Sequence, residues 1–212
     1  ILELAKQHKP KMIIAGYTSY PWAPDFAKFR AICDEVGAFL MADIAHPAGM
    51  AIAGAYPNPI DYADVVTFTT HKTLMGPRAA VILTTNGKYA TKINNAVFPG
   101  EQGGPHMNTI AALSVAFHLA RTESFKALQH KIVANAKLLA DEFKRLGLRL
   151  SYGGTDTHLL LIDLKGLKGK NGELLYGEPA ATILETAGIV LNKNTIPGDA
   201  MTPLASGLRL GT

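Results

Sequence analysis

Apolar runs of strand length recur along the first half of the chain, and helical or loop segments separate several of them. The runs occupy residues 11–16, 38–43, 64–70 and 79–84. Each is almost continuously apolar, which is typical of strands in a parallel sheet that is covered on both faces. Between the first two runs, Asp25 precedes a segment with a 3.6-residue apolar period that ends at Gly37, as in a capped helix. The first half therefore predicts an α/β fold with a mostly parallel sheet flanked by helices.

The second half opens with a long helical pattern. Apolar residues repeat at helical spacing from Phe125 to Leu146. Thr122 and Gly147 stand where an N-cap and a C-cap belong. Beyond this helix the pattern predicts a strand over 158–164, a helix over 179–188 and short strands over 189–191 and 208–210. We therefore expect part of a large domain over 1–120, a linking helix over 121–148 and the start of a smaller α+β domain over 149–212.

Composition excludes several classes of protein. With 212 residues, 48% of them hydrophobic, the chain can bury a sizeable core and is not disordered. No apolar run reaches the ~18 residues that a membrane helix needs. The single cysteine, Cys33, excludes an internal disulfide and a thiolate zinc site, and favours the cytoplasm. The net charge of +4 is spread along the chain and gives little support for nucleic-acid binding.

Polar residues stand at or just after the ends of the apolar runs, where ligands bind in open α/β sheets. Lys72 follows the third run. A partly desolvated lysine has an amine that can attack a carbonyl, although an exposed lysine with a packed stem also fits this position. Asp43 ends the second run and could pair with a protonated ring nitrogen or cap the next helix. His46 would share a helical face with Asp43 if a helix began there, and by itself it also fits a structural histidine.

Two weaker patterns lie nearby. Gly103 and Gly104 precede a helical pattern at 107–121, so they could cradle a phosphate on backbone N–H groups or form a plain turn. Asp43, His46 and His71 could in principle hold a metal, but no HxH or HExxH spacing supports this. We therefore expect no metal.

Six stretches are similar to serine hydroxymethyltransferases, enzymes of fold type I that use pyridoxal 5′-phosphate (PLP). They occur in the family's order, and THKTLMGPR at 70–78 is highly specific. The resemblance implies reversible conversion of L-serine and tetrahydrofolate to glycine and 5,10-methylenetetrahydrofolate. The matching stretches are MADIAHPAGMAIAGAYPNP (41–59), VVTFTTHKTLMGPR (65–78), NNAVFPGEQGGP (94–105), GGTDTHLLLIDL (153–164), VLNKNTIP (190–197) and SGLRLGT (206–212).

The resemblance also implies roles in binding PLP. Lys72 would hold the cofactor as an aldimine, and Asp43 would pair with its pyridinium nitrogen. His46, with Thr18 where the family commonly has serine, would bind the 3′ oxygen. Two further residues would line the pocket beside the lysine: Thr69 and His71.

Other matches concern the substrates and the partner subunit. Arg209 would clamp the carboxylate of the amino acid, a contact that suits a planar guanidinium, and Arg78 would lie close to the active site. Asn194 and the loop at 201–204 would contact tetrahydrofolate. Gly103 and Gly104 would reach the PLP phosphate of a neighbouring subunit, which implies a homodimer or tetramer.

The chain departs from the family's pattern at Phe68, at Glu101, at 79–80 and at Trp22, which replaces a common arginine. None of these changes removes a PLP contact, but together they indicate a divergent branch with a different substrate. A folate-independent β-hydroxy-amino-acid aldolase and an α-methylserine hydroxymethyltransferase are therefore alternatives on the same scaffold.

A catalytically inactive homologue that binds protein or RNA is the alternative from another class. It would be expected to have lost Lys72 or Asp43 or to carry a basic tail, and neither mark is seen. About half of the family's chain is present, without an initiator methionine, so we expect an internal segment of a longer protein. By itself this segment is expected to be inactive.

Overall fold

The computed structural model describes residues 1–212, which form two compact units. Unit 1 consists of Ile1–Thr18 and Ala23–His130, and unit 2 consists of Ser19–Trp22 and Lys131–Thr212. The chain thus enters unit 2 for four residues directly after Thr18, and enters it again inside a long helix.

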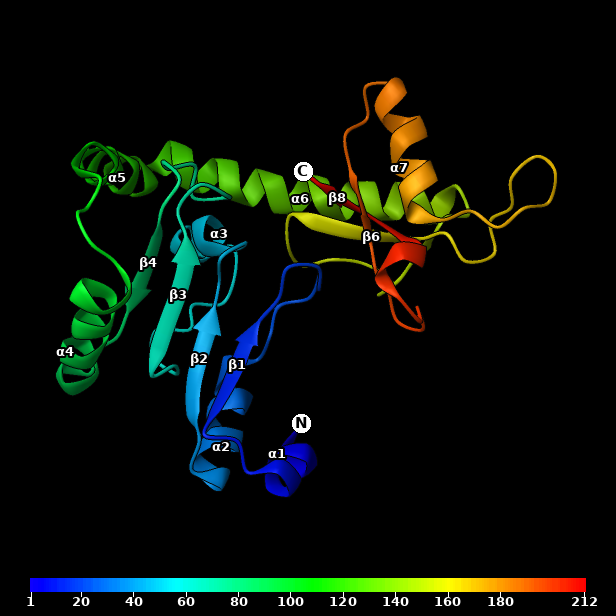
Figure 1. Ribbon diagram of the computed structural model, residues 1–212. Coiled ribbons are helices and arrows are strands. Elements are labelled where there is room, and N and C mark those ends of the chain that lie inside the picture. Colours follow the sequence, from blue (N-terminus) through cyan, green and yellow to red (C-terminus); the bar gives the residue numbers. More distant parts are fainter. The chain divides into compact units, whose positions relative to one another are not determined.

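Helices and strands alternate through most of the chain (Figure 1). None of the helices is both long enough and apolar enough to cross a membrane. The helices are α1 (Leu2–His8), α2 (Phe26–Val36), α3 (Ala48–Ile52), α4 (Gly87–Asn95), α5 (Met107–Ala120), α6 (Glu123–Arg145) and α7 (Gly177–Thr186), with short helical segments η1 (Ala96–Glu101) and η2 (Thr202–Leu204). The strands are β1 (Met12–Gly16), β2 (Phe39–Asp43), β3 (Val65–Thr69), β4 (Ala80–Leu83), β5 (Arg149–Leu150), β6 (Leu159–Asp163), β7 (Asn192–Asn194) and β8 (Gly207–Gly211).

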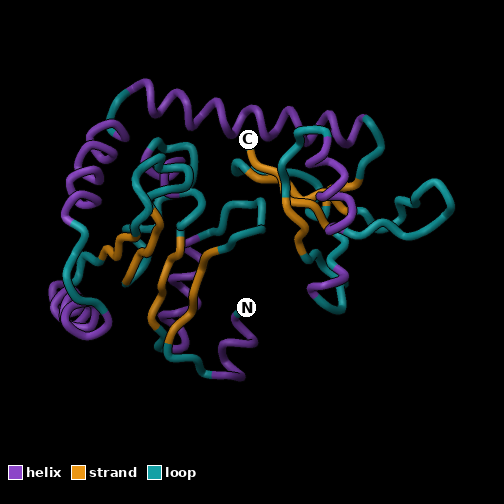
Figure 2. Tube along the Cα trace, turned by 45° about the horizontal axis from the view of Figure 1, so that its top comes forward, coloured by secondary structure: helices purple, strands orange, loops and turns teal.

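Unit 1 contains a four-stranded sheet in the order β1-β2-β3-β4. Figure 2 shows these strands side by side. β1, β2 and β3 are parallel, which confirms the prediction of a mostly parallel α/β sheet. β4 runs antiparallel to β3. Only residues 70–79 connect these two strands, whereas a parallel return needs about a dozen residues or more.

Helix α2 shows why the periodic pattern was informative. The Asp25 side chain accepts a hydrogen bond from the Lys28 amide at 3.0 Å, and Gly37 ends the helix with φ +69°. The buried face of α2 carries Phe26, Phe29 and Cys33, and the helix packs against β1 and β2. The predicted helix and both of its caps are confirmed.

The two faces of the unit 1 sheet differ in burial. Successive side chains of a strand point to opposite faces. Leu40, Ala42, Val66 and Phe68 are buried, whereas the alternate positions are more exposed, with Ile14 at 60%. The most buried part of this core therefore lies on β2 and β3, next to the residues that end those strands.

Unit 2 contains an antiparallel sheet in the order β5-β6-β8-β7. Its core includes Leu160, Ile162 and Leu208 from the two central strands and Ala140 from α6. The predicted strand at 189–191 is displaced, because Asn192 is the residue that pairs with Arg209 at the start of β7. The two-residue strand β5 was not predicted from the sequence.

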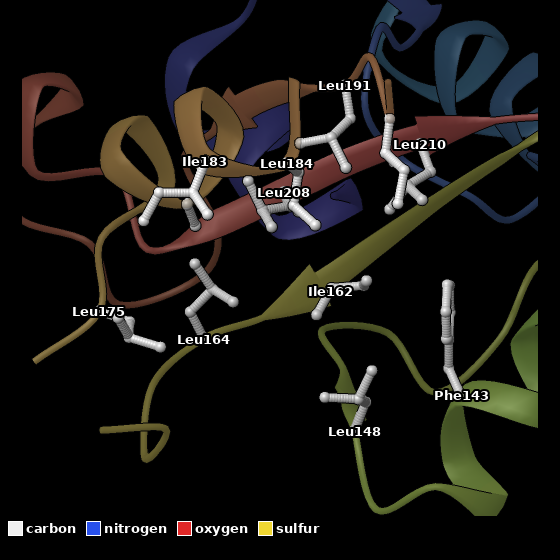
Figure 3. Close-up of a pocket in the computed structure, with 12 residues that line it drawn as sticks. Phe143, Leu148, Ile162, Leu164, Leu175, Ile183, Leu184, Leu191, Leu208 and Leu210 are labelled. Carbon is white, nitrogen blue, oxygen red and sulfur yellow. The ribbon is translucent and has the colours of Figure 1, made fainter. Parts of the chain in front are cut away.

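An apolar cavity of about 370 Å³ lies over this sheet. Figure 3 shows its lining side chains. They come from α6, β6, α7 and β8 and from the segments between these elements, and include Phe143, Ile162, Ile183, Leu184 and Leu208. None of the lining residues has a group that can transfer a proton or bind a charge. The candidate chemistry therefore lies elsewhere.

Candidate active site

The carboxyl ends of β1, β2 and β3 meet at one edge of the unit 1 sheet. The register places Gly16 opposite Asp43, and Asp43 opposite Thr67. Because the three strands are parallel, the residues that end or follow them gather at this edge. Arg78 joins them, since β4 runs the opposite way and begins there. The other candidates that the topology brings to this edge are Thr18, Asp43, His46, Thr69, His71 and Lys72.

Asp43 is held by its own chain rather than by a helix. Its Oδ1 accepts a hydrogen bond from the Ala45 amide at 2.9 Å. Helix α3 begins only at Ala48, with Pro47 at the N-cap position, so the alternative that Asp43 caps this helix is wrong. A Cβ atom on Gly16 would lie 2.2 Å from the Asp43 carbonyl oxygen. Only glycine therefore lets β1 approach Asp43 this closely.

His46 does not share a helical face with Asp43, because the chain between them is not helical. The main chain of this turn is nevertheless tied to β3 and to the segment that follows it. The Thr69 hydroxyl donates to the Ala45 carbonyl at 3.1 Å, and the Thr73 hydroxyl donates to the His46 carbonyl.

Lys72 lies in a closed loop between β3 and β4. Thr70 is fully buried and holds the loop together: its hydroxyl donates to the Pro77 carbonyl at 2.6 Å, and its carbonyl accepts from the Gly76 amide at 2.7 Å. Within the loop, the Met75 amide donates to the Lys72 carbonyl at 2.9 Å. Met75 has φ +62°, a left-handed conformation that is uncommon outside glycine. Lys72 itself is half-buried rather than fully exposed.

Thr73, the residue after Lys72, connects the loop to two other elements. Its hydroxyl accepts a hydrogen bond from the Gly49 amide of α3 at 3.0 Å. Its carbonyl accepts a hydrogen bond from Gln129 Nε2 of α6 at 2.8 Å. A Cβ atom on Gly49 would lie 2.2 Å from this carbonyl oxygen, so α3 and the loop are in close backbone contact.

His71 presents a polar atom without a partner. Its Nε2 lies 3.4 Å from Nη1 of Arg78, and its Nδ1 is buried with no hydrogen-bond partner. A guanidinium can only donate, so we assign Nε2 as the acceptor and place the ring proton on Nδ1. A buried donor of this kind is costly unless a ligand meets it.

The remaining candidates belong to other elements of the chain. Gly103 and Gly104 are exposed between η1 and α5. Arg209 and Asn194 belong to unit 2, on β8 and β7. Arg209 Nε donates to the side-chain oxygen of Asn192, its register partner, at 3.1 Å.

The family model of serine hydroxymethyltransferase matches residues 1–212, which is the whole chain. The chain belongs to the serine hydroxymethyltransferase family. It is 52% identical to a serine hydroxymethyltransferase of Myxococcus xanthus, over 99% of this chain and 49% of the relative. It is 54% identical to serine hydroxymethyltransferase 2 of Cupriavidus pinatubonensis, over 98% of this chain and 48% of the relative. The chain thus spans about half the length of the curated relatives it matches.

The resemblance found in the sequence is therefore confirmed, and with it the α/β fold class of this family. Three residues that support the lysine loop were not predicted: Thr70, Thr73 and Gln129. The first two lie within the motif at 70–78, but nothing in their sequence shows that their side chains close the loop. Gln129 does carry one, because it is a polar residue on the apolar stripe of α6, between the buried Phe125 and Ala136.

Proposed function

We propose that this member of the serine hydroxymethyltransferase family interconverts L-serine and glycine, with tetrahydrofolate as co-substrate and PLP as cofactor. The observation that carries the proposal is the placing of Lys72, Asp43 and His71 at one sheet edge of a chain that matches the family throughout. A homodimer or tetramer and a cytoplasmic location are part of the same proposal and are supported by the resemblance.

The donor set of this edge fits PLP. Lys72 is half-buried and its amine suits an aldehyde, and the carboxylate of Asp43 suits a protonated ring nitrogen. The buried, unpartnered Nδ1 of His71 supplies a donor that awaits a polar group. When bound, PLP supplies an electron-poor ring that stabilises negative charge at the α-carbon of the amino acid. Thr18 and His46 would bind the 3′ oxygen, Thr69 would line the pocket, and Gly103 and Gly104 would serve a neighbouring subunit's phosphate.

Each residue then has a limited task. Asp43, oriented by the Ala45 amide, would keep a proton on the ring nitrogen. Lys72 would bind the cofactor through Nζ. This nitrogen would gain or lose a proton when the amino group of the substrate takes its place. Arg209 would bind the amino-acid carboxylate, with its guanidinium plane oriented by Asn192. Arg78 would add positive charge beside His71, and Asn194 with the loop at 201–204 would contact the folate.

The test uses the whole protein. It is saturated with PLP, its visible spectrum is recorded, and borohydride is added to fix any Schiff base before peptide mapping. We expect the pyridoxyl label on Lys72, and serine cleavage that depends on tetrahydrofolate. A Lys72→Arg variant keeps the charge and should lose the visible band. A label elsewhere would overturn the proposed site, and rapid folate-independent cleavage of allo-threonine, or turnover of α-methylserine in preference to serine, would overturn the proposed substrates.

A further inference from the structure

Gln129 is a buried polar residue with one hydrogen-bond partner and one unpaired atom. It lies on α6, is fully buried, and donates one hydrogen bond, from Nε2 to the Thr73 carbonyl at 2.8 Å. Its Oε1 is buried and has no hydrogen-bond partner. Burying an amide with an unpaired oxygen is costly, and this cost offsets what the bond to Thr73 contributes to stability. The single bond to Thr73 is what this position gains from glutamine.

That bond holds the peptide between Thr73 and Leu74, which is separated from the Lys72–Thr73 peptide by one Cα atom. In the structure Gln129 Nε2 is the donor to the Thr73 carbonyl, and the close backbone of Gly49 occupies the neighbouring space. The Thr73 hydroxyl is bonded to Gly49 and to the His46 carbonyl. Thr73 is therefore fixed through both its side chain and its carbonyl, and the carbonyl bond is the one that comes from α6.

We infer that Gln129 is a positioning residue: it fixes the orientation of the Thr73 peptide and thereby the direction in which Lys72 presents its amine. The inference rests on the proposed function, because it takes Lys72 as the residue that holds PLP. Without the amide donor, the Thr73 carbonyl must rotate to find another partner. That rotation passes to Lys72 through one Cα atom and through the turn closed by the Met75 amide.

The neighbouring residue of α6 provides a matched control. His130 Nε2 lies 3.2 Å from the carbonyl of Ala53, at the end of α3. This contact also joins a side chain of α6 to a main-chain carbonyl of unit 1, but it does not touch the lysine loop. If Gln129 only attached α6 to the rest of unit 1, loss of the His130 contact would have the same consequences.

The test compares Gln129→Leu and His130→Leu with the wild type in the whole protein reconstituted with PLP. The readouts are the rate of PLP release, the pH titration of the visible band, and the unfolding midpoint. We expect Gln129→Leu to release PLP about tenfold faster and to shift the titration, since a buried hydrogen bond has been lost. Its unfolding midpoint should change little, because the unpaired Oε1 is removed together with the donor. His130→Leu should release PLP at the wild-type rate.

A second variant keeps the side-chain size and makes the donor depend on pH. In Gln129→Glu the protonated carboxyl can donate to the Thr73 carbonyl, whereas the ionised carboxylate cannot. PLP release should therefore approach the wild-type rate at low pH and become faster as the carboxyl ionises. This variant also carries the test if Gln129→Leu does not fold.

The outcomes separate the two proposals. A wild-type protein in which borohydride does not label Lys72 defeats the proposed function. A labelled wild type whose PLP release and titration are unchanged in Gln129→Leu, or changed equally in His130→Leu, defeats only the positioning role. Release from Gln129→Glu that does not respond to pH would also count against it.

Discussion

Asp199 closes the loop between β7 and β8, and its replacement should weaken unit 2 in a way that depends on pH. The side chain is 3% exposed. Its Oδ2 accepts hydrogen bonds from the amides of Ile196 at 2.9 Å and Ser206 at 3.0 Å, so one oxygen joins both ends of the loop. Its Oδ1 accepts from the Ser206 hydroxyl and lies 3.1 Å from Lys165 Nζ.

These contacts set the direction of the pKa shift. Burial by itself would raise the pKa of Asp199. The hydroxyl and amide of Ser206, the amide of Ile196 and the ammonium of Lys165 outweigh burial and hold the pKa well below the ordinary value of 3.8. Because the folded-state pKa is lowered, the stabilisation is present above the unfolded-state pKa and is lost as the pH falls through the folded-state pKa.

The size of the effect follows from what each substitution leaves behind. Asp199→Ala leaves two amides and a hydroxyl without their acceptor around a buried position, which should cost about 3–5 kcal/mol, whereas Lys165 Nζ keeps its bond to the Pro197 carbonyl at 2.7 Å. Asp199→Asn keeps an oxygen that can accept from the amides of Ile196 and Ser206. It loses the negative charge that strengthens those bonds and attracts Lys165, which should cost about 1–3 kcal/mol. The Lys165 pair contributes the smaller share, because the lysine side chain is 33% exposed.

The assay is urea unfolding followed by circular dichroism, repeated over a pH series. Asp156→Asn is the control, since Asp156 is 46% exposed and lies 3.7 Å from Lys137 Nζ in the same unit. It should change the free energy of unfolding by less than about 0.5 kcal/mol. The gap between wild type and Asp199→Asn should be constant at neutral pH and should shrink below about pH 4. A gap that stays the same down to about pH 2, or an Asn variant as unstable as the Ala variant, would refute the reasoning.

Two glycines lead to further predictions. Gly16→Ala places a Cβ atom 2.2 Å from the Asp43 carbonyl oxygen, so unfolding in urea should show a loss of about 1–3 kcal/mol and PLP binding to the whole protein should weaken. Gly154→Ala places a Cβ atom 2.9 Å from the Trp22 ring, whose Nε1 donates to the Tyr152 carbonyl at 3.0 Å. Trp22 is the only tryptophan of the chain, so its fluorescence should shift to longer wavelength in Gly154→Ala but not in the control Gly87→Ala, which has no neighbouring atom within 4 Å.

The sequence predicted the parts of the fold that depend on burial and helix caps. Periodicity locates α2 because its buried face, Asp25 and Gly37 all lie within one short segment. Periodicity does not show which strands pair with one another or in which direction. The direction of β4 depends on the length of the connection from β3, and the position of β7 depends on its pairing with Arg209. The apolar run at 189–191 is itself not buried, since Val190 is 82% exposed, so apolar character alone did not locate this strand.

The same division applies to the candidate site. Lys72 and Asp43 could be named from the sequence because each ends or follows an apolar run and matches a specific motif. The groups that orient them could not, because they come from elsewhere in the fold. Gln129 is distant from Thr73 along the chain, and Gly16 matters to Asp43 only because β1 and β2 are in register. Such relations become visible when the strands are paired.

In both units, therefore, the pairing of apolar strands sets where a loop begins, and buried polar side chains determine which conformation the loop adopts. Strand pairing brings the ends of several strands to one edge of a sheet. A loop that leaves a strand can still adopt many conformations, and apolar contacts do not discriminate strongly among them. A buried polar side chain does, because any other loop conformation leaves it unpaired at a cost of about 1–3 kcal/mol. Thr70 selects the conformation of the loop that holds Lys72, and Asp199 selects that of the loop that precedes Arg209. Substitutions at these buried positions should therefore alter function more than substitutions of equal cost in the apolar core, where the loop conformation is not at stake.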